Sequence, residues 1–444
     1  AVQVYSKILV EDYGYPKEHI QTHPQHRVKV RPSDTKKEYP VDIAVFPNSK
    51  KEENDISIII ECKKKNRKDG KTQLQDYLRF SRSPIGVWFN GEERLFIKKI
   101  EKDGKILFED IPNIPKYGQR LEDVGKFKRK DLKPATNLKN VFKAMRNYLA
   151  GNVVGATRDE VFAQQLINLI FCKLYDEKFT KPNEMVSFRA GIDESPKEVF
   201  KRINEIFIKV KKNYDDVIDT SDNIMLDEYS LTYIVGELQQ YAIMESNRDA
   251  ISDAFEVFIG HALKGAQGQF FTPRNVVKMV VEMVDPNPSD KIMDPACGSG
   301  GFLVESLRYI WEKAEIEYND LGWPKHEIEI EKQKIAIKNL RGIDKDYFLS
   351  KVAKAYMALL GDGRGGIFCE NSLEATNHWN KKTRDEIKFE YFDHILTNPP
   401  FGSKIQVKGE EMLKQYELGH SWKIDKKTNK FAKGKLKAKE TIDW

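Results

Sequence analysis

The segment from Lys291 to Leu303 constrains the fold of this chain more than any other. It reads KIMDPACGSGGFL, in which a short apolar strand leads into a glycine turn and then into the start of a helix. Gly298 and Gly300 allow the backbone of such a turn to approach a bound molecule closely, and Asp294 ends the strand. The spacing is D-x-x-x-G-x-G, so this turn is not the dinucleotide fingerprint G-x-G-x-x-G. Strand, tight turn and helix in this order predict an open α/β sheet.

Polar side chains follow three further predicted strands of this region. Asp344 ends the run Gly-Ile-Asp and is placed to bind ribose hydroxyls. Asn371 closes the candidate strand 366–371, where it can meet an adenine edge, and Asn398 follows the strand 392–397. Because ligands of open α/β sheets bind at the carboxyl ends of the strands, these residues predict one ligand site.

The four residues Asn398, Pro399, Pro400 and Phe401 are suited to the methylation of an exocyclic amine. The lone pair of such a nitrogen is delocalised into its ring, so the nitrogen is a poor nucleophile. The Asn398 side-chain oxygen and the Pro399 carbonyl can each accept one amino hydrogen, and two prolines hold these acceptors still. Phe401 can stack on a base that has left its duplex. An Asn-Pro turn that only closes a strand is the alternative, and the neighbouring glycine turn favours the chemical interpretation.

Together with GQFFTPR at 268–274, these motifs resemble the modification subunits of type I restriction systems. More broadly they resemble gamma-class DNA N6-adenine methyltransferases that use S-adenosylmethionine. The resemblance covers 138 to the chain end, and Asn371 stands where the family more often has Asp. It implies a cofactor site in which Phe271, Thr272 and Pro273 line the methionine end. The cofactor loop would be formed by Asp294, Ala296, Gly298 and Gly300. Asp344 would bind the ribose, and Asn371 would lie near the adenine.

A second group of polar residues lies near the N-terminus. Asp42 lies in the predicted strand 41–46, and Glu61 and Lys63 follow the apolar run 56–60. Strand alternation places Glu61 and Lys63 on one face of the sheet. Two carboxylates can hold Mg²⁺, which polarises a phosphate and lowers the pKa of an attacking water. Lys63 would orient that water or offset charge that develops on phosphorus.

Gln73 and Tyr77 lie on one face of a predicted helix over 72–80. The order D…E-x-K followed by Q-x-x-x-Y resembles the PD-(D/E)XK nuclease domain of restriction subunits and RecB-like nucleases. The alternative is a charged strand exit, because E-x-K occurs by chance in a lysine-rich chain. The resemblance implies catalytic Asp42, Glu61, Lys63 and Gln73, with Mg²⁺ at Asp42 and Glu61, and Glu11 as a further candidate.

The chain divides into four predicted parts. Residues 1–110 form the nuclease domain, and 111–137, rich in lysine and containing three prolines, form a linker. Apolar stripes at helical spacing in 159–179, 196–210, 226–244 and 249–263 predict a helical domain over 138–265. Residues 266–444 form the methyltransferase domain. The predicted fold class is therefore α/β multidomain: a PD-(D/E)XK nuclease, a helical connector and a Rossmann-like methyltransferase, incomplete at the C-terminus because only four of its seven expected strands can be placed.

Composition excludes several classes of protein. Lys+Arg is 74 and Asp+Glu is 68, so the net charge is 74 − 68 = +6, which suits a nucleic-acid partner without requiring one. No stretch approaches the about 18 apolar residues of a membrane span. The four cysteines include no C-x-x-C pair, which disfavours a disulfide framework or a zinc ribbon. No G-x-x-x-x-G-K-[ST] occurs, so no ATP-driven motor is predicted.

The eight lysines of 423–439 have two interpretations. They predict either a solvated loop or a loop that contacts phosphate. The spacing of the lysines does not decide between the two.

The two resemblances together predict a cytoplasmic prokaryotic restriction–modification enzyme of the type IIG arrangement. Such an enzyme methylates adenine N6 in a specific sequence of double-stranded DNA and cleaves unmethylated DNA with Mg²⁺. A specificity subunit or a C-terminal target-recognition domain would supply the sequence recognition. Two alternatives stay open: a methyltransferase whose nuclease-like domain only binds DNA, and a non-catalytic DNA-binding subunit that senses S-adenosylmethionine.

Overall fold

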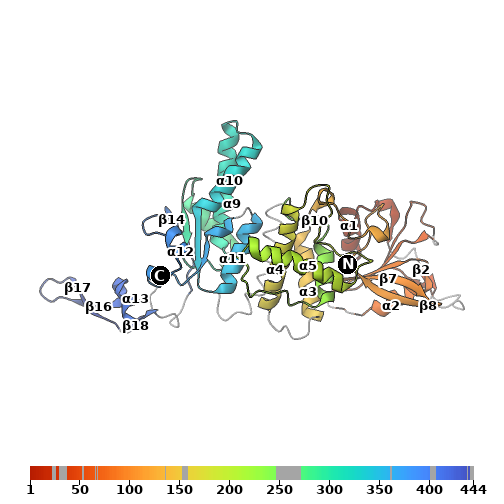
Figure 1. Ribbon diagram of the computed structural model, residues 1–444, viewed down its shortest axis with the longest axis horizontal. Coiled ribbons are helices and arrows are strands. Elements are labelled where there is room, and N and C mark those ends of the chain that lie inside the picture. The colour runs from red at the N-terminus through yellow and green to blue at the C-terminus, as the bar shows by residue number, and fades with distance from the viewer. Residues whose placement is uncertain are drawn as a thin grey trace. The chain divides into compact units, whose positions relative to one another are not determined.

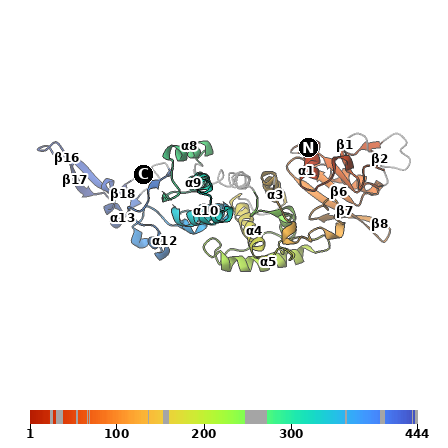
Figure 2. The same cartoon turned by 90° about the horizontal axis from the view of Figure 1, so that it is seen from above.

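The structure is a computed structural model that describes most of the 444 residues. The described residues are 1–22, 27–29, 38–52, 55–65, 67, 69–135, 137–152, 159–246, 272–360, 363–400, 407–437 and 439–440. They form two compact units, which are drawn in Figures 1 and 2. Unit one contains Ala1–Asn213 and the residues that follow from Thr220, and unit two contains Tyr214–Asp219 and the described residues from Thr272 on.

Unit one is built on a mixed sheet of six strands. The strands in spatial order are β1 (Ile20–Thr22), β4 (Ile43–Val45), β5 (Ile58–Cys62), β6 (Ile85–Phe89), β7 (Arg94–Lys102) and β8 (Lys105–Ile111). Only β5 and β6 are parallel neighbours, and helix α2 (Lys71–Phe80) is the crossover that such a pair requires. A separate antiparallel pair joins β2 (Arg27–Lys29) to β3 (Glu38–Pro40).

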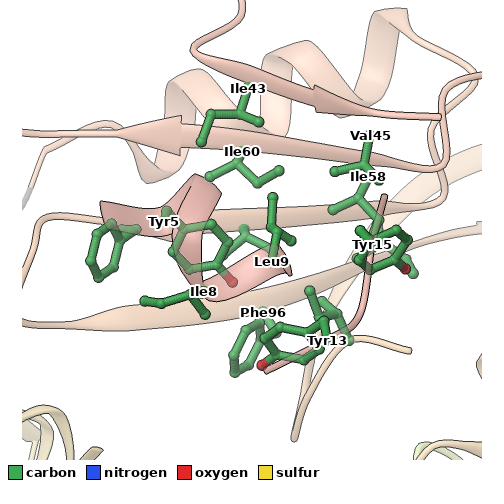
Figure 3. Close-up of a cluster of buried hydrophobic side chains, with 14 of the residues drawn as sticks. Tyr5, Ile8, Leu9, Tyr13, Tyr15, Ile43, Val45, Ile58, Ile60 and Phe96 are labelled. Carbon is green, nitrogen blue, oxygen red and sulfur yellow. The ribbon is translucent and has the colours of Figure 1, made fainter. Parts of the chain in front are cut away.

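Each face of this sheet packs against one helix. Ile58 and Ile60 of β5 contact the buried side of α1 (Val2–Glu11), which Figure 3 shows around Tyr5 and Leu9. Ile59 points the other way and belongs to the cluster that contains the buried side of α2. Because side chains alternate along a strand, Glu61 lies on the α2 face, and Cys62 packs against the α1 cluster.

The helical part of unit one confirms several predicted helices. The helices are α3 (Leu138–Asn152), α4 (Asp159–Phe179), α5 (Pro196–Asn213) and α6 (Glu228–Leu238). The predicted helix over 226–244 is shorter at both ends. Asp227 caps the start of α6 by accepting from the Ser230 amide at 2.9 Å, and the helix already ends at Leu238. After α6 the chain forms β10 (Tyr241–Ala242), which pairs in parallel with β9 (Lys133–Pro134). The predicted helix over 249–263 lies outside the described residues.

The segment 111–137, predicted as a linker, is instead part of the core of unit one. Most of its apolar side chains are buried but follow no regular period, so the sequence with its lysines and prolines predicts a linker. Asn113 is buried, accepts a hydrogen bond from the Tyr13 hydroxyl at 2.6 Å and donates to the Gly236 carbonyl at 3.0 Å. A buried ion pair joins Arg94 of β7 to Glu237 of α6. The sheet and the helices therefore share one interior. The segment includes the short 3-10 helices η3 (Leu121–Asp123) and η4 (Arg129–Asp131).

Unit two contains a sheet of four parallel strands, the four that the sequence predicts. Their spatial order is β13 (Ile367–Cys369), β12 (Leu340–Asp344), β11 (Ile292–Asp294) and β14 (His394–Ile395). The helices along this part of the chain are α8 (Arg274–Val284), α9 (Gly301–Asp320), α10 (Lys325–Asn339), α11 (Tyr347–Leu360) and α12 (Lys381–Glu386). Gly342 lets α9 approach the sheet closely, since a Cβ there would lie 2.6 Å from Leu303 Cδ1. The 3-10 turns η5 (Gly363–Gly366) and η6 (Thr376–His378) flank β13.

The lysine-rich end of the chain forms a hairpin rather than the predicted loop. Strand β16 (His420–Ile424) pairs in antiparallel fashion with β17 (Phe431–Leu436). Before the hairpin come β15 (Val407–Lys408), α13 (Glu410–Lys414) and η7 (Glu417–Gly419), and after it β18 (Lys439–Glu440) pairs with β15. Among the described residues, no helix has the length and apolar character to cross a bilayer.

Candidate active sites

The carboxyl ends of the four parallel strands bring together the residues predicted for unit two. Asp294 ends β11 and stands in register with Gly342 of β12, while Asp344 ends β12. Asn371 follows β13 by two residues, and Asn398 follows β14 by three. Since all four strands are parallel, these residues lie at one edge of the sheet, which is where open α/β sheets bind ligands.

Asp294 is a buried carboxyl at the bottom of this edge. Only 1% of its surface is exposed, and burial raises its pKa to about 7, with the nearby Asp344 carboxylate acting in the same direction. Its Oδ1 accepts from the Ala296 amide at 3.1 Å. No basic side chain of the described residues forms an ion pair with Asp294. A buried carboxylate in that position is stabilised by a cationic ligand, because an opposite charge favours the ionised form. Asp294 therefore fits the ammonium group of an amino-acid ligand.

The glycine turn is held by Asp344. Its Oδ2 accepts from the Gly298 amide at 2.9 Å, and its Oδ1 accepts from the Asp346 amide at 2.8 Å. Gly298 has φ +53° with open space where a Cβ would lie, and Gly300 has φ +87°. Each Asp344 oxygen has one lone pair left, so the carboxylate can also accept ribose hydroxyls. The open turn, Asp294 and Asp344 together fit an aminoacyl nucleoside such as S-adenosylmethionine.

Asn398 is oriented by a residue far away in the sequence. Its Nδ2 donates to Oγ1 of Thr272 at 2.9 Å, which leaves the Asn398 Oδ1 free of that contact. Thr272 directly precedes Pro273, the N-cap of α8. Pro399 is half-buried and Pro400 is exposed, whereas the predicted residues Phe271 and Phe401 lie outside the described residues.

Asn371 uses its side chain in the turn that follows β13. Its Oδ1 accepts from the Leu373 amide at 3.2 Å, and its Nδ2 lies 3.4 Å from Glu374 Oε1. The indole of Trp379 donates to its carbonyl at 2.9 Å. The same edge contains Cys297, whose pKa burial raises well above its usual value, so this thiol is a packing group and not a nucleophile.

A second cluster forms on the α2 face of the sheet in unit one. Lys63 Nζ donates to Oε1 of Glu61 and to Oε1 of Gln73, the latter at 2.9 Å. Gln73 Nε2 donates to the Tyr77 hydroxyl at 2.5 Å, one helical turn along α2. Asp42 Oδ2 accepts from the Cys62 amide at 2.7 Å. The structure thus connects Glu61, Lys63 and Gln73 directly and ties Asp42 to the strand that carries Glu61.

The donor set of this cluster suits a hard divalent cation. Glu61 Oε2 is buried and has no hydrogen-bond partner among the described residues. Burial raises the pKa of Glu61 to about 7, partly offset by Lys63. The described residues contain no group of three or more His, Cys, Asp or Glu side chains arranged for a metal. Two carboxylates nevertheless suffice for Mg²⁺, which completes its shell with water and substrate phosphates. Glu11 instead forms an ion pair with Lys7 at 3.6 Å on an exposed face.

Three contacts of these sites were not predicted from the sequence. Thr272 and Asn398 are 126 positions apart, so no local spacing relates them. The hydrogen bond from Gly298 to Asp344 likewise crosses between strands. Gly70, with φ +102°, leaves the space that the Lys63 side chain fills, since a Cβ there would clash with Lys63 Cε. The sequence offers one signal for the last contact, a glycine two residues before the start of the predicted helix.

Comparisons with known proteins follow the same division of the chain. Residues 246–435 match the family described as N-6 DNA Methylase. Residues 2–115 match the family described as Type I restriction enzyme R protein N terminus.

Individual relatives match parts of the chain. The methylase subunit of the type I restriction enzyme StySPI from Salmonella potsdam is 27% identical over 160 residues, which are 35% of this chain and 28% of that protein. The type II restriction enzyme and methyltransferase RM.BcgI from Heyndrickxia coagulans is 26% identical over 194 residues, 43% of this chain and 27% of that protein. A solved type I restriction-modification methyltransferase subunit from Streptococcus thermophilus is 14% identical with a TM-score of 0.37, covering 60% and 63% of the two chains. The chain thus spans less than a third of the length of these curated relatives.

Proposed function

We propose that this chain, which joins an N-6 DNA methylase segment to a segment of the type I restriction-subunit N terminus, methylates adenine N6 in the DNA of a restriction–modification system. The observation that carries the proposal is the hydrogen bond from Asn398 Nδ2 to Thr272. It turns the Asn398 Oδ1 into a fixed acceptor directly before Pro399, at the sheet edge that also contains Asp294 and Asp344. An acceptor pair of this kind suits an amino group and has no evident use in an Asn-Pro turn.

The residues of unit two have separate roles in this reaction. S-adenosylmethionine, when bound, supplies an electrophilic methyl group. Asp294 would bind its ammonium group, and Asp344 would bind its ribose hydroxyls. Asn398 Oδ1 and the Pro399 carbonyl accept the two amino hydrogens of a flipped adenine, so the nitrogen lone pair leaves the ring system and points at the methyl carbon. Aligning the lone pair in this way lowers the barrier to direct transfer. The nitrogen–carbon bond forms as the sulfur–carbon bond breaks, the thioether S-adenosylhomocysteine leaves, and the methylated nitrogen releases one proton to water.

Methyl transfer from labelled S-adenosylmethionine tests this function. The protein is incubated with unmethylated genomic DNA, and the product nucleosides are separated. We expect N6-methyladenine, and we expect Asn398→Ala to lower the rate by about 10² to 10³, the cost of removing one preorganised polar contact to a transition state. Label in cytosine, or label in RNA or protein with none in DNA, would contradict the proposal. No transfer by the complete protein despite cofactor binding would favour the non-catalytic, cofactor-sensing alternative.

For unit one we propose Mg²⁺-dependent hydrolysis of DNA phosphodiesters, which would make the chain a fused restriction–modification enzyme of type IIG arrangement. Support comes from the hydrogen bonds that join Glu61, Lys63 and Gln73. It also comes from the buried Glu61 Oε2, which no described residue contacts by a hydrogen bond. Further support comes from the relationship to RM.BcgI, a restriction enzyme and methyltransferase in one protein. In this reaction Mg²⁺ supplies charge neutralisation at the phosphate. Lys63 positions the attacking water, and Gln73 holds the Lys63 ammonium group in place.

A nuclease-like fold that only binds DNA accounts for the same contacts. Cleavage of unmethylated DNA, with and without Mg²⁺, distinguishes the two. For an active nuclease we expect Asp42→Ala and Lys63→Ala to abolish cleavage and leave methylation unchanged, and Asn398→Ala to do the reverse. If the wild-type protein binds DNA but leaves it intact in Mg²⁺, the nuclease-like fold only binds DNA. Loss of both activities by one folded variant would contradict two separate sites.

A further inference from the structure

The hairpin of β16 and β17 is a well-defined ribbon that ends in a structured turn. Both views show its strands extending beyond α13 in unit two (Figures 1 and 2). Asp425 organises the turn: its backbone amide donates to the Lys430 carbonyl at 2.9 Å, and its carboxylate accepts from the Lys427 amide and the Thr428 hydroxyl. Asn429 takes φ +53°, as such a turn requires. The lysines of this segment are therefore displayed on a fixed scaffold.

The charge of the hairpin is positive and unbalanced. Its six exposed lysines form no ion pair with any described residue, and they are Lys423, Lys426, Lys427, Lys430, Lys433 and Lys435. The acidic side chain among them, Asp425, is engaged in the turn, and those hydrogen bonds lower its pKa. Some lysines elsewhere in unit two pair with acids, as Lys313 does with Asp285 and Lys334 with Glu331. The hairpin is thus suited to a partner that supplies many negative charges.

One face of the ribbon combines these charges with apolar side chains. Trp422 stands opposite Lys433, and Ile424 stands opposite Phe431, so strand alternation puts all four on the same face. Trp422, Ile424 and Phe431 are 38%, 55% and 71% exposed. The Trp422 indole donates to the Glu417 carbonyl at 2.9 Å, which fixes its ring at the base of the hairpin. Cations beside exposed rings match a nucleic acid, in which phosphates alternate with sugars and bases.

The base of the hairpin is anchored beside the methylation site. Val407, Leu413 and Leu373 form one buried cluster, and the Tyr416 hydroxyl donates to the Leu373 carbonyl at 2.8 Å. Leu373 lies two residues after Asn371, at the carboxyl edge of the sheet. Seven residue steps separate Pro400 from Val407, so covalent geometry holds them within about 25 Å, at most about 3.6 Å a step. This distance is shorter than one turn of duplex DNA, about 34 Å.

We propose that the β16–β17 hairpin is a DNA-binding arm that holds the duplex on one side of the target adenine. Lysines of the turn and of β17 contact phosphates, and Phe431 and Ile424 lie against sugars or bases. The inference rests on the proposed methylation of DNA. It adds a surface that binds duplex DNA whatever its base sequence. Antiparallel two-stranded ribbons are one of the elements that fit a DNA groove.

The salt dependence of DNA binding tests the arm. Affinity of the whole protein for a duplex of arbitrary sequence is measured by fluorescence anisotropy between 50 and 200 mM salt. The variant replaces Lys426, Lys427 and Lys430 with alanine. The matched control replaces Lys325, Lys334 and Lys338 of α10, which removes the same charge from another exposed surface of unit two. We expect the slope of log affinity against log salt to become shallower by about 2 to 3 in the variant, about 0.9 for each lost phosphate contact, and to stay nearly unchanged in the control.

The outcomes separate the arm from the catalytic proposal. Equal slopes for the two triple variants would overturn the arm, even if the protein methylates DNA. A shallower slope only in the hairpin variant supports the arm, whatever the rate of methyl transfer. If that variant fails to fold, Lys433→Ala with Lys435→Ala gives a second measurement, for which we expect a change of about 2. Phe431→Ala should weaken duplex binding without changing the slope, because it removes no charge.

Discussion

The Asn398 amide nitrogen donates to the hydroxyl oxygen of Thr272 across 2.9 Å of space and 126 positions of sequence. The contact joins the loop after β14 to the N-terminal end of α8. The motifs that contain Asn398 and Thr272 are far apart in the sequence but belong to one site. Thr272 does not need to touch the substrate to influence the reaction. It sets which atom of the Asn398 amide is available as an acceptor.

Thr272→Val should slow methyl transfer measured at saturating S-adenosylmethionine. Valine has the shape of threonine without the hydroxyl, so the Asn398 amide loses its partner and rotates. A neutral hydrogen bond contributes about 0.5 to 1.5 kcal/mol, so we expect kcat to fall by about 2- to 10-fold. Single-turnover methylation at saturating cofactor measures the effect. Thr272→Ser keeps the acceptor and should restore most of the rate; equal losses in both variants would argue against an orienting role.

Binding of S-adenosylmethionine should strengthen as pH rises through neutrality. Burial raises the pKa of Asp294 to about 7, so this carboxyl is mostly protonated at pH 6 and mostly ionised at pH 8. Only the ionised form attracts the ammonium group of the cofactor, and the affinity should therefore rise by about tenfold between these two values. Isothermal titration calorimetry measures it. Asp294→Asn should bind weakly at both pH values, and a wild-type affinity that does not change with pH would contradict this role.

Much of unit two could be predicted because its signals are local. The strand, glycine turn and helix around Gly298 lie within a dozen residues, and β11, β12, β13 and β14 appear where apolar runs end in Asp or Asn. Alternation along β5 also placed Glu61 opposite Cys62 correctly. Such patterns follow from the period of a strand or a helix, which a sequence displays directly.

The features that were missed depend on contacts between distant residues. The segment 111–137 has a linker's composition, yet its Asn113 is buried between Tyr13 and Gly236, each at least 100 positions away. The hairpin at 420–436 carries a short apolar alternation, with Trp422 and Ile424 on one strand and Phe431 on the other. Both of its faces are largely exposed, however, so it lacks the longer alternation of a half-buried strand. Backbone pairing and the Asp425 turn stabilise it, and neither produces a hydrophobic period.

Stability of the protein should respond to Mg²⁺ in a pH-dependent way if Asp42 and Glu61 hold the ion. Burial raises the folded-state pKa of Glu61 to about 7, above its unfolded value. At pH values between the two pKa values, the folded protein therefore binds one more proton than the unfolded protein. The contribution of Glu61 to stability is therefore present at low pH and is lost as pH rises through about 7. Glu61→Gln, which stays neutral, should melt at a higher temperature than wild type at pH 8.

Mg²⁺ at pH 8 should reverse part of that loss in the wild-type protein, because the ion binds the ionised carboxylate. Differential scanning calorimetry with and without Mg²⁺ gives a readout that does not need nuclease activity. We expect a rise in Tm for wild type and none for Asp42→Ala or Glu61→Gln. An equal rise in all three proteins would place the ion elsewhere.

Gly70→Ala should abolish DNA cleavage and spare methylation. A Cβ at this position meets Lys63 Cε and lies 3.3 Å from Trp88 Nε1, so the lysine must leave its hydrogen bond to Gln73. The substitution also strains a backbone with φ +102°, at a cost of about 1 to 2 kcal/mol. Gly91→Ala is the matched control, because Gly91 has φ +90° and open space at its Cβ. Both variants should lose similar stability in urea, but only Gly70→Ala should lose cleavage. If the two variants cleave DNA equally well, the position of Lys63 does not matter for hydrolysis, and the catalytic role proposed for it is wrong.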